Sequence, residues 1–171
     1  DSDDFEFTTI EDLSEDPHRT LLLGMKTSTL YHVQITAKGG GKTYASSVET
    51  VETGPQRTGL PPIEFPTEKE GEIFEGVTIA CSGAGAGRGG QGTSWASILD
   101  NDGDYVWGYE QPPETAQCVR SRMSYNGQYM WTGNGNVNAT DGALTRVTMD
   151  GLDERIYDRP ARHHDYIVLP S

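Results

Sequence analysis

Residues 122–131 read RMSYNGQYMW and place an Asn-Gly pair between two segments of apolar and aromatic residues. Both residues of such a pair accept positive φ, so the pair is the strongest short-range signal for a β-hairpin. Similar turns stand 24 residues earlier, at Asp102-Gly103, and 24 residues later, at Asp150-Gly151. A hairpin that returns at a fixed period is typical of radial or stacked β architectures. The sequence therefore predicts an all-β fold built from repeated hairpins.

The composition of the chain agrees with a turn-rich β protein. Its 171 residues include 21 glycines and only 34% hydrophobic residues, and no long helical periodicity is present. The formal net charge of −13 repels phosphate backbones, so we expect no nucleic-acid partner. No apolar run approaches the roughly 18 residues that a membrane-spanning helix requires, so we expect no transmembrane segment.

The two cysteines, Cys81 and Cys118, do not have the spacing of metal ligands, so we expect no zinc site. In an exported chain they would form one disulfide bond, and otherwise they would be two buried thiols. The sequence leaves both alternatives open. The chain starts at Asp1 without an initiator methionine or a signal peptide, which fits either a removed leader or a shortened chain.

A first unit is indicated by residues 23–54, LGMKTSTLYHVQITAKGGGKTYASSVETVETG. Apolar residues alternate from Tyr31 to Ala37, three glycines form a turn, and a second predicted strand follows them. This stretch resembles the last three strands of a fibronectin type III domain. The resemblance implies a small, partial β-sandwich over residues 1–54, in which the Tyr31 hydroxyl ties its strand to the preceding loop.

Residues 55–76 separate this unit from the rest of the chain. Their prolines are Pro55, Pro61, Pro62 and Pro66. Proline fixes φ and removes a backbone donor, so we expect a stiff, extended linker. A second unit would then occupy residues 77–171.

The glycines Gly85, Gly87 and Gly90 follow a predicted strand and have the spacing of a dinucleotide-binding loop. That loop works only where it opens a helix whose N-terminus holds the pyrophosphate. Here a second strand follows, toward Ile98 and Leu99. We therefore expect a long connection and assign no cofactor-binding residue.

Asp100, Asp102 and Asp104 give one turn the oxygen-rich composition of a calcium loop. An EF-hand loop also needs a bidentate acid at its twelfth position and helices on both sides. Counted from Asp100, the twelfth position is Gln111, which is not an acid, and the flanking segments are predicted strands. We therefore expect an ordinary turn, with a structural Ca²⁺ at the three aspartates as the alternative and no other metal or cofactor.

Three segments of the second unit carry a more informative pattern: SWASILDNDGDYVWGYE (94–110), RSRMSYNGQYMWTGN (120–134) and ARHHDYIVLPS (161–171). Together they resemble the start of the arylsulfotransferase-like family, whose members are secreted β-propellers, often preceded by a small sandwich. The resemblance implies that residues 77–171 form the first blades of an incomplete propeller. It also implies an extracytoplasmic location, either periplasmic or secreted.

Enzymes of that family move a sulfuryl group from one phenolic ester to another phenol through a sulfated histidine. The resemblance therefore implies that His164 or His163 lines the funnel of the propeller, with Arg162 and Asp165 supporting it. Neighbouring side chains of a strand face opposite sides, so only one histidine can reach the channel, and we favour His164. The histidine that carries the sulfuryl group in the family would lie farther along the propeller. We expect His18 and His32 to be surface residues.

Arginines are concentrated in the second half of an otherwise acidic chain, at Arg120, Arg122, Arg146, Arg155, Arg159 and Arg162. Such a group can bind a sulfate or a carboxylate. Cross-strand pairing with nearby acids explains most of them equally well, and we prefer it for all but Arg162. The acids available for such pairs are Asp150, Asp153, Glu154, Asp158 and Asp165.

The second unit holds about two blades, whereas a propeller closes with at least about four. A strand that ended near Ser171 would expose unpaired backbone groups. We therefore expect a second polypeptide to carry the rest of the propeller, and a small phenolic or ester substrate to bind between the two. Two other functions fit the sequence: a propeller hydrolase or transferase acting on esters, lactones or amides, and a non-catalytic binding or adhesion module.

Overall fold

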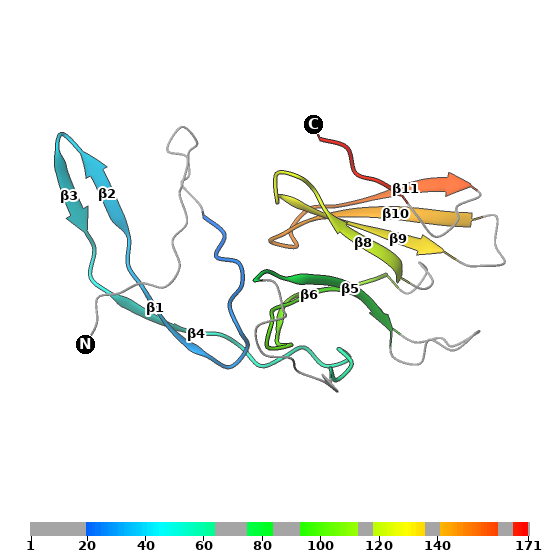
Figure 1. The fold of residues 1–171 in the computed structure, drawn as a ribbon, viewed down its shortest axis with the longest axis horizontal. Coiled ribbons are helices and arrows are strands. Elements are labelled where there is room, and N and C mark those ends of the chain that lie inside the picture. The colour runs from blue at the N-terminus through cyan, green and yellow to red at the C-terminus, as the bar shows by residue number, and fades with distance from the viewer. Residues whose placement is uncertain are drawn as a thin grey trace.

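The computed structural model describes residues 20–63, 75–83, 93–112, 118–135, 141–160 and 166–170. Eleven strands and no helix occur in these ranges, which confirms the all-β prediction (Figure 1). All the strand pairs are antiparallel. Within the same ranges, nothing has the length and apolar character of a membrane-crossing helix.

The N-terminal unit is a long, interrupted hairpin that extends away from the other sheets (Figure 1). Its strands are β1 (Leu30–Val33), β2 (Thr36–Gly39), β3 (Lys42–Ala45) and β4 (Glu49–Glu52). Strand β1 pairs with β4 and β2 pairs with β3. At the interruption, the Ser46 N–H donates to the Ile35 carbonyl over 2.9 Å, so the two arms stay connected.

Tyr31 makes the hydrogen bond that the sequence predicts for it. The N–H of Lys26, five residues upstream, donates to the Tyr31 hydroxyl over 2.7 Å. The side chains of β2 to β4 are exposed and those of β1 are at most half-buried. Residues 20–63 contain no second sheet covering this hairpin. The partial sandwich over residues 1–54 therefore stays a prediction.

The C-terminal unit consists of two antiparallel meanders. The first contains β5 (Thr78–Gly83), β6 (Ser94–Leu99) and β7 (Tyr105–Glu110) in that order. The second contains β8 (Cys118–Met123), β9 (Tyr129–Gly135), β10 (Asp141–Thr148) and β11 (Glu154–Pro160), also in sequence order.

The three predicted turns join strands of these meanders. Gly103 lies between β6 and β7, Gly127 between β8 and β9, and Gly151 between β10 and β11. Their φ values of 86°, 70° and 72° lie in the region that glycine tolerates best. The hairpin predictions are therefore confirmed.

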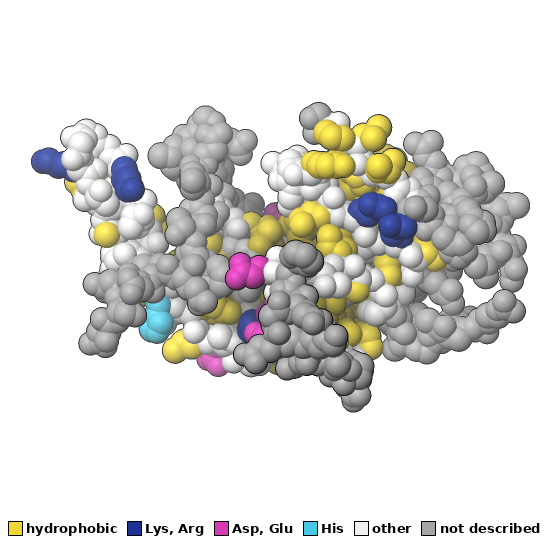
Figure 2. Space-filling model, in the orientation of Figure 1, with side chains coloured by type: hydrophobic (Ala, Val, Ile, Leu, Met, Phe, Trp, Pro, Cys, Tyr) yellow, Lys and Arg dark blue, Asp and Glu magenta, His cyan; other side chains and the backbone are white. Residues whose placement is uncertain are grey.

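The two meanders pack face to face around one hydrophobic core (Figure 1). Its buried residues are Ala96, Ile98, Met130, Val147 and Met149. Side-chain hydrogen bonds also join the sheets: for example, the Trp107 indole N–H donates to the Met149 carbonyl, and the Tyr109 hydroxyl donates to Glu154. Figure 2 shows hydrophobic side chains gathered over this unit, whereas fewer of them are visible on the N-terminal hairpin.

The beginning of the predicted linker packs against the first meander. A β-carbon at Gly59 would lie 3.5 Å from the Trp95 ring, and the Leu60 side chain reaches within 3.6 Å of the equivalent position at Gly108. The Tyr105 hydroxyl donates to the Pro61 carbonyl over 2.8 Å. Trp95 is consequently 1% exposed, although it lies on the sheet face opposite the core residue Ala96.

Candidate functional site

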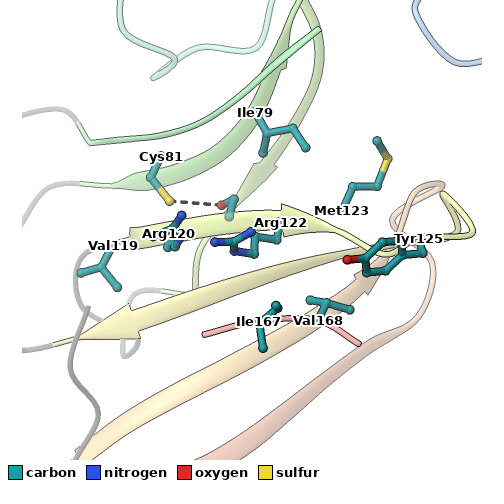
Figure 3. Close-up of a pocket in the computed structure, with 10 residues that line it drawn as sticks. Ile79, Cys81, Val119, Arg120, Arg122, Met123, Tyr125, Ile167 and Val168 are labelled. Carbon is teal, nitrogen blue, oxygen red and sulfur yellow. Dashed lines mark hydrogen bonds between the residues drawn. The ribbon is translucent and has the colours of Figure 1, made fainter. Parts of the chain in front are cut away.

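A hollow of about 600 Å³ opens beside β8. Strand β5 forms one wall, and Ile167 and Val168 of the segment 166–170 border the other side (Figure 3). The residues that line it are Ile79, Cys81, Val119, Arg120, Ser121, Arg122, Met123, Tyr125, Ile167 and Val168. In Figure 3, Arg120 and Arg122 lie between the two walls. The hollow thus combines two guanidinium groups with aliphatic side chains and an aromatic ring.

A β-bulge at the start of β8 decides which way these arginines face. Cys118 pairs with Asn134 but Arg120 pairs with Gly133, so Val119 is an extra residue on β8. Strict alternation would have put Arg120 on the same face as Cys118, which packs against the core. Because the bulge shifts the alternation by one residue, Cys118 faces the core while Arg120 and Arg122 face away from it.

The face away from the core carries a cross-strand row that we call the arginine row: Arg122, Trp131, Arg146 and Arg155. Arg146 stacks over the Tyr129 ring at 4.4 Å and lies 3.4 Å from the Asp153 carboxylate. Trp131 stacks on Tyr157 with ring centroids 5.7 Å apart. The predicted pairing with acids is therefore confirmed for Arg146.

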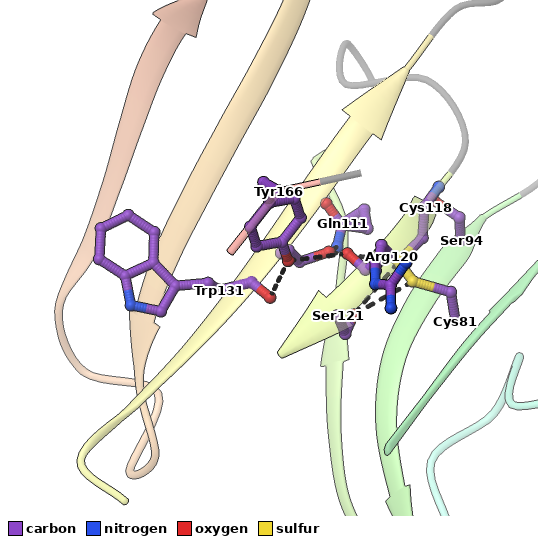
Figure 4. The surroundings of a disulfide bond; sticks show 9 residues. Cys81, Ser94, Gln111, Cys118, Arg120, Ser121, Trp131 and Tyr166 are labelled. Carbon is purple, nitrogen blue, oxygen red and sulfur yellow. Dashed lines mark hydrogen bonds between the residues drawn. A yellow bond between two sulfur atoms is a disulfide. The ribbon is translucent and has the colours of Figure 1, made fainter. Parts of the chain in front are cut away.

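Cys81 and Cys118 form a disulfide bond, which settles the alternative that the sequence left open (Figure 4). It joins β5 of the first meander to β8 of the second, with the two Cα atoms 5.5 Å apart. The hydroxyl groups of Ser121 and Thr132 lie within 3.4 Å of the Cys118 sulfur. The bond therefore ties together two walls of the hollow that share no strand pairing.

Tyr166 anchors the segment 166–170, which borders the hollow, on the second meander. Its hydroxyl is 2.6 Å from the Trp131 carbonyl and 3.0 Å from the Arg120 carbonyl, and it donates its proton to this pair (Figure 4). Its ring lies over Gly133, where the absence of a side chain permits the approach. Ile167 and Val168, which follow Tyr166, consequently lie beside the two arginines.

The histidine site predicted from the sequence cannot be placed on this surface. Arg162, His163, His164 and Asp165 lie outside the described residues and directly precede Tyr166 in the chain. His32 is exposed on β1, as expected, whereas His18 lies outside the described part.

The predicted glycine connection, with Gly85, Gly87 and Gly90, also lies outside the described residues. Its flanking strands β5 and β6 pair with each other in antiparallel fashion. A dinucleotide fold requires parallel strands in that place, so the pairing argues against nucleotide binding.

Asp100, Asp102 and Asp104 form a turn, and their carboxylate oxygens lie within 4.8 Å of one another. One Asp100 oxygen accepts the N–H groups of Asp102 and Asp104, which is the turn chemistry expected from the sequence. The three carboxylates surround the ammonium group of Lys26. Hydrogen bonds to Asp102, Asp104 and Asp100 raise the pKa of Lys26.

The sequence assigned two residues of the hollow, Arg120 and Arg122, to pairing with acids rather than to a binding site. An Arg-x-Arg pair beside a methionine is compatible with an exposed strand face, and only the bulge and the position of β5 show that the pair borders a hollow.

No family model, no curated protein and no solved structure matches the chain. The functional argument therefore depends on the residues of the hollow themselves.

Proposed function

We propose that the chain is the N-terminal part of an extracytoplasmic, arylsulfotransferase-like β-propeller enzyme. Such an enzyme transfers a sulfuryl group between phenolic compounds through a histidine. The observation that carries the proposal is the position of Arg120 and Arg122 in a hollow bordered by β5, β8 and residues 166–170.

The arrangement of the strands supports the propeller. Each blade of a propeller is an antiparallel meander, and the first strands of successive blades surround a central channel. Here β5 and β8 are the first strands of two successive meanders, and residues 166–170 follow the second meander in the chain. All three border the same hollow.

The chemistry of the hollow supports an aryl sulfate as the ligand. A guanidinium group presents a planar fork of N–H donors that matches the oxygens of a tetrahedral anion. Arg120 and Arg122 can therefore bind the sulfate oxygens and stabilise the charge that develops during transfer. Ile79, Ile167 and the ring of Tyr125 supply an apolar surface for the phenyl ring.

The proposal assigns His164 to the site, with His163 as the alternative and with Arg162 and Asp165 in support, because these residues directly precede Tyr166 in the chain. A neutral imidazole nitrogen is a good nucleophile and hydrogen-bonding partner near pH 7. The histidine that carries the sulfuryl group in the family would come from the second polypeptide. That polypeptide would also supply the blades that complete the ring.

The disulfide bond supports the extracytoplasmic location. Disulfides persist in oxidising compartments and are rare in the cytosol. Cys81–Cys118 is formed in this structure, and the described residues hold no free cysteine.

A matched set of arginine variants tests the proposal. The protein, with any polypeptide that co-purifies, is assayed for transfer from 4-nitrophenyl sulfate to phenol, and binding of the ester is measured by equilibrium dialysis. We expect R120A/R122A to reduce transfer about 100-fold and to weaken binding. Arg155→Ala removes an exposed arginine of the same sheet face and should leave both unchanged. His164→Ala should also reduce transfer by orders of magnitude.

The proposal fails if the wild-type protein neither binds nor turns over any aryl sulfate. It also fails if R120A/R122A and R155A behave alike. A non-catalytic binding module is the second candidate, because the exposed hairpin displays Ile35, Tyr44 and Val51 without a described covering layer. That function predicts saturable binding to a glycan or protein without turnover of any ester.

A further inference from the structure

One lysine of the N-terminal unit is surrounded by the acidic turn of the C-terminal unit. The Lys26 Nζ atom lies 3.1 Å from Asp100 Oδ2, 2.6 Å from Asp102 Oδ2 and 2.8 Å from Asp104 Oδ2. An ammonium group has three N–H donors, so each carboxylate can accept one of them. Lys26 thereby occupies the position in which a calcium loop would hold its ion.

Side chains at the base of the β1–β4 hairpin form hydrogen bonds with both the N–H and the carbonyl group of Lys26. Its N–H donates to the Tyr31 hydroxyl over 2.7 Å, and its carbonyl accepts the Thr53 hydroxyl over 2.5 Å. Thr53 in turn accepts the N–H of Thr29 over 2.9 Å. Tyr31, which resembles the corner tyrosine of a fibronectin type III domain, thus helps to orient Lys26 toward the C-terminal unit.

The acidic turn is likewise arranged by its own backbone. Asp100 Oδ1 accepts the N–H groups of Asp102 and Asp104 at 3.0 and 2.9 Å, which leaves Asp100 Oδ2 for the lysine. The Gly103 N–H donates to the Asp100 carbonyl over 3.2 Å and closes the turn. Because both partners are ordered by local hydrogen bonds, less conformational freedom is lost when they meet.

We propose that the Asp100–Asp104 turn is a receptor for the Lys26 ammonium group and that this contact clamps the N-terminal hairpin onto the first meander. The contact between linker and sheet lies beside it, since Tyr105 follows the turn and binds the Pro61 carbonyl. The clamp gives the acidic turn an internal cation and excludes a divalent ion from it. It stands independently of the proposed sulfuryl transfer.

The first test measures how readily the linker opens. Trypsin cleavage after the exposed Arg57 is followed by mass spectrometry, and its rate reports the open population when opening is fast. We expect Lys26→Met to raise this rate about threefold or more, because an ion cluster between the units is lost. Lys42→Met removes the same charge from the exposed strand β3 and should leave the rate unchanged.

Salt separates an ionic clamp from simple packing. Because exposed charges are screened at high ionic strength, 1 M NaCl, with a screening length of about 3 Å, should raise wild-type cleavage toward the K26M rate. K26M itself should respond little. Equal rates for wild type and K26M at low salt would overturn the proposal.

Terbium binding tests whether the ammonium occupies the acidic turn. Tb³⁺ replaces Ca²⁺ at oxygen ligands, and Tyr105, the residue that follows Asp104, can sensitise its luminescence. K26M leaves three carboxylates within 4.8 Å without their cation, so it should bind Tb³⁺ about tenfold more tightly than wild type. Asp102→Asn in the K26M background should abolish this gain. Equal Tb³⁺ affinity of wild type and K26M would overturn the proposal.

Discussion

The ring of Tyr166 lies against Gly133 so closely that a β-carbon at position 133 would be 2.9 Å from Tyr166 Cε1. This contact, with the hydrogen bonds from the Tyr166 hydroxyl to the carbonyls of Trp131 and Arg120, seats residues 166–170 on the second meander. The border of the hollow beside the two arginines therefore depends on a glycine in β9.

Replacing Gly133 by alanine should displace Tyr166 and loosen the border of the hollow. Overpacking of this kind costs about 1–3 kcal/mol of unfolding free energy. Urea denaturation measures the loss, and hydrogen exchange should show less protection in residues 166–170. Gly39→Ala is the control, because a β-carbon there would meet nothing within 4 Å. Equal stability of the two variants would contradict the assigned role of Gly133.

Removing the disulfide bond should destabilise the C-terminal unit and weaken ligand binding in the hollow. The bond closes a loop with a sequence separation of 37, for which chain entropy predicts about 2–4 kcal/mol. The variant C81S/C118S is compared with wild type by urea denaturation, with and without reductant. Reductant should lower the stability of wild type only. A stable variant that binds 4-nitrophenyl sulfate as wild type does would show that the bond does not set the shape of the hollow.

Deleting Val119 should be far less damaging than deleting Ser121. Without Val119, Cys118 and Arg120 become adjacent and alternate regularly against Asn134 and Gly133, the partners that they already have. Without Ser121, Arg122 would have to face the core or β8 would have to change its pairing with β9. Burying an uncompensated arginine costs about 3–5 kcal/mol. Thermal unfolding of both variants checks the difference, and similar melting temperatures would refute the role of the bulge.

The stability provided by the Lys26 clamp should be constant near neutral pH and should fall in acid. Burial by itself would raise the pKa of Asp100, but hydrogen bonds from the Asp104 backbone and the Lys26 ammonium outweigh it and lower that pKa. Asp100 therefore contributes stability above about pH 3.9, its unfolded value, and this is lost as the pH falls through the lower folded value. The raised pKa of Lys26 gives a contribution that is complete below about pH 10.4 and is lost only at higher pH.

The measurement is the difference in urea midpoint between wild type and K26M across pH. It should be level from about pH 5 to about pH 9 and should shrink toward pH 3. The difference between wild type and K42M should stay near zero throughout. A K26M difference that increases in acid would contradict the lowered pKa of Asp100.

Much of the fold could be predicted because its signals are local. Each Asx-Gly turn depends on the φ angles of adjacent residues, and all three turns occur where they were expected. The Tyr31 hydrogen bond spans five residues and was also foreseen. The candidate site was harder, since the predicted histidine cluster lies outside the described residues and the arginines were expected to pair mainly with acids.

By itself, the sequence determined the all-β class, the three hairpin turns and the acidic character of the chain. Turn chemistry and charge are properties of neighbouring residues or of composition, so they need no knowledge of packing. Only the tertiary structure decided that Cys81 bonds to Cys118, that the β8 bulge leaves both arginines on the face away from the core and that Lys26 meets Asp102. The last contact joins residues 76 positions apart. Such pairs form because sheets pack face to face and strands shift register, and neither event leaves a local pattern in the chain.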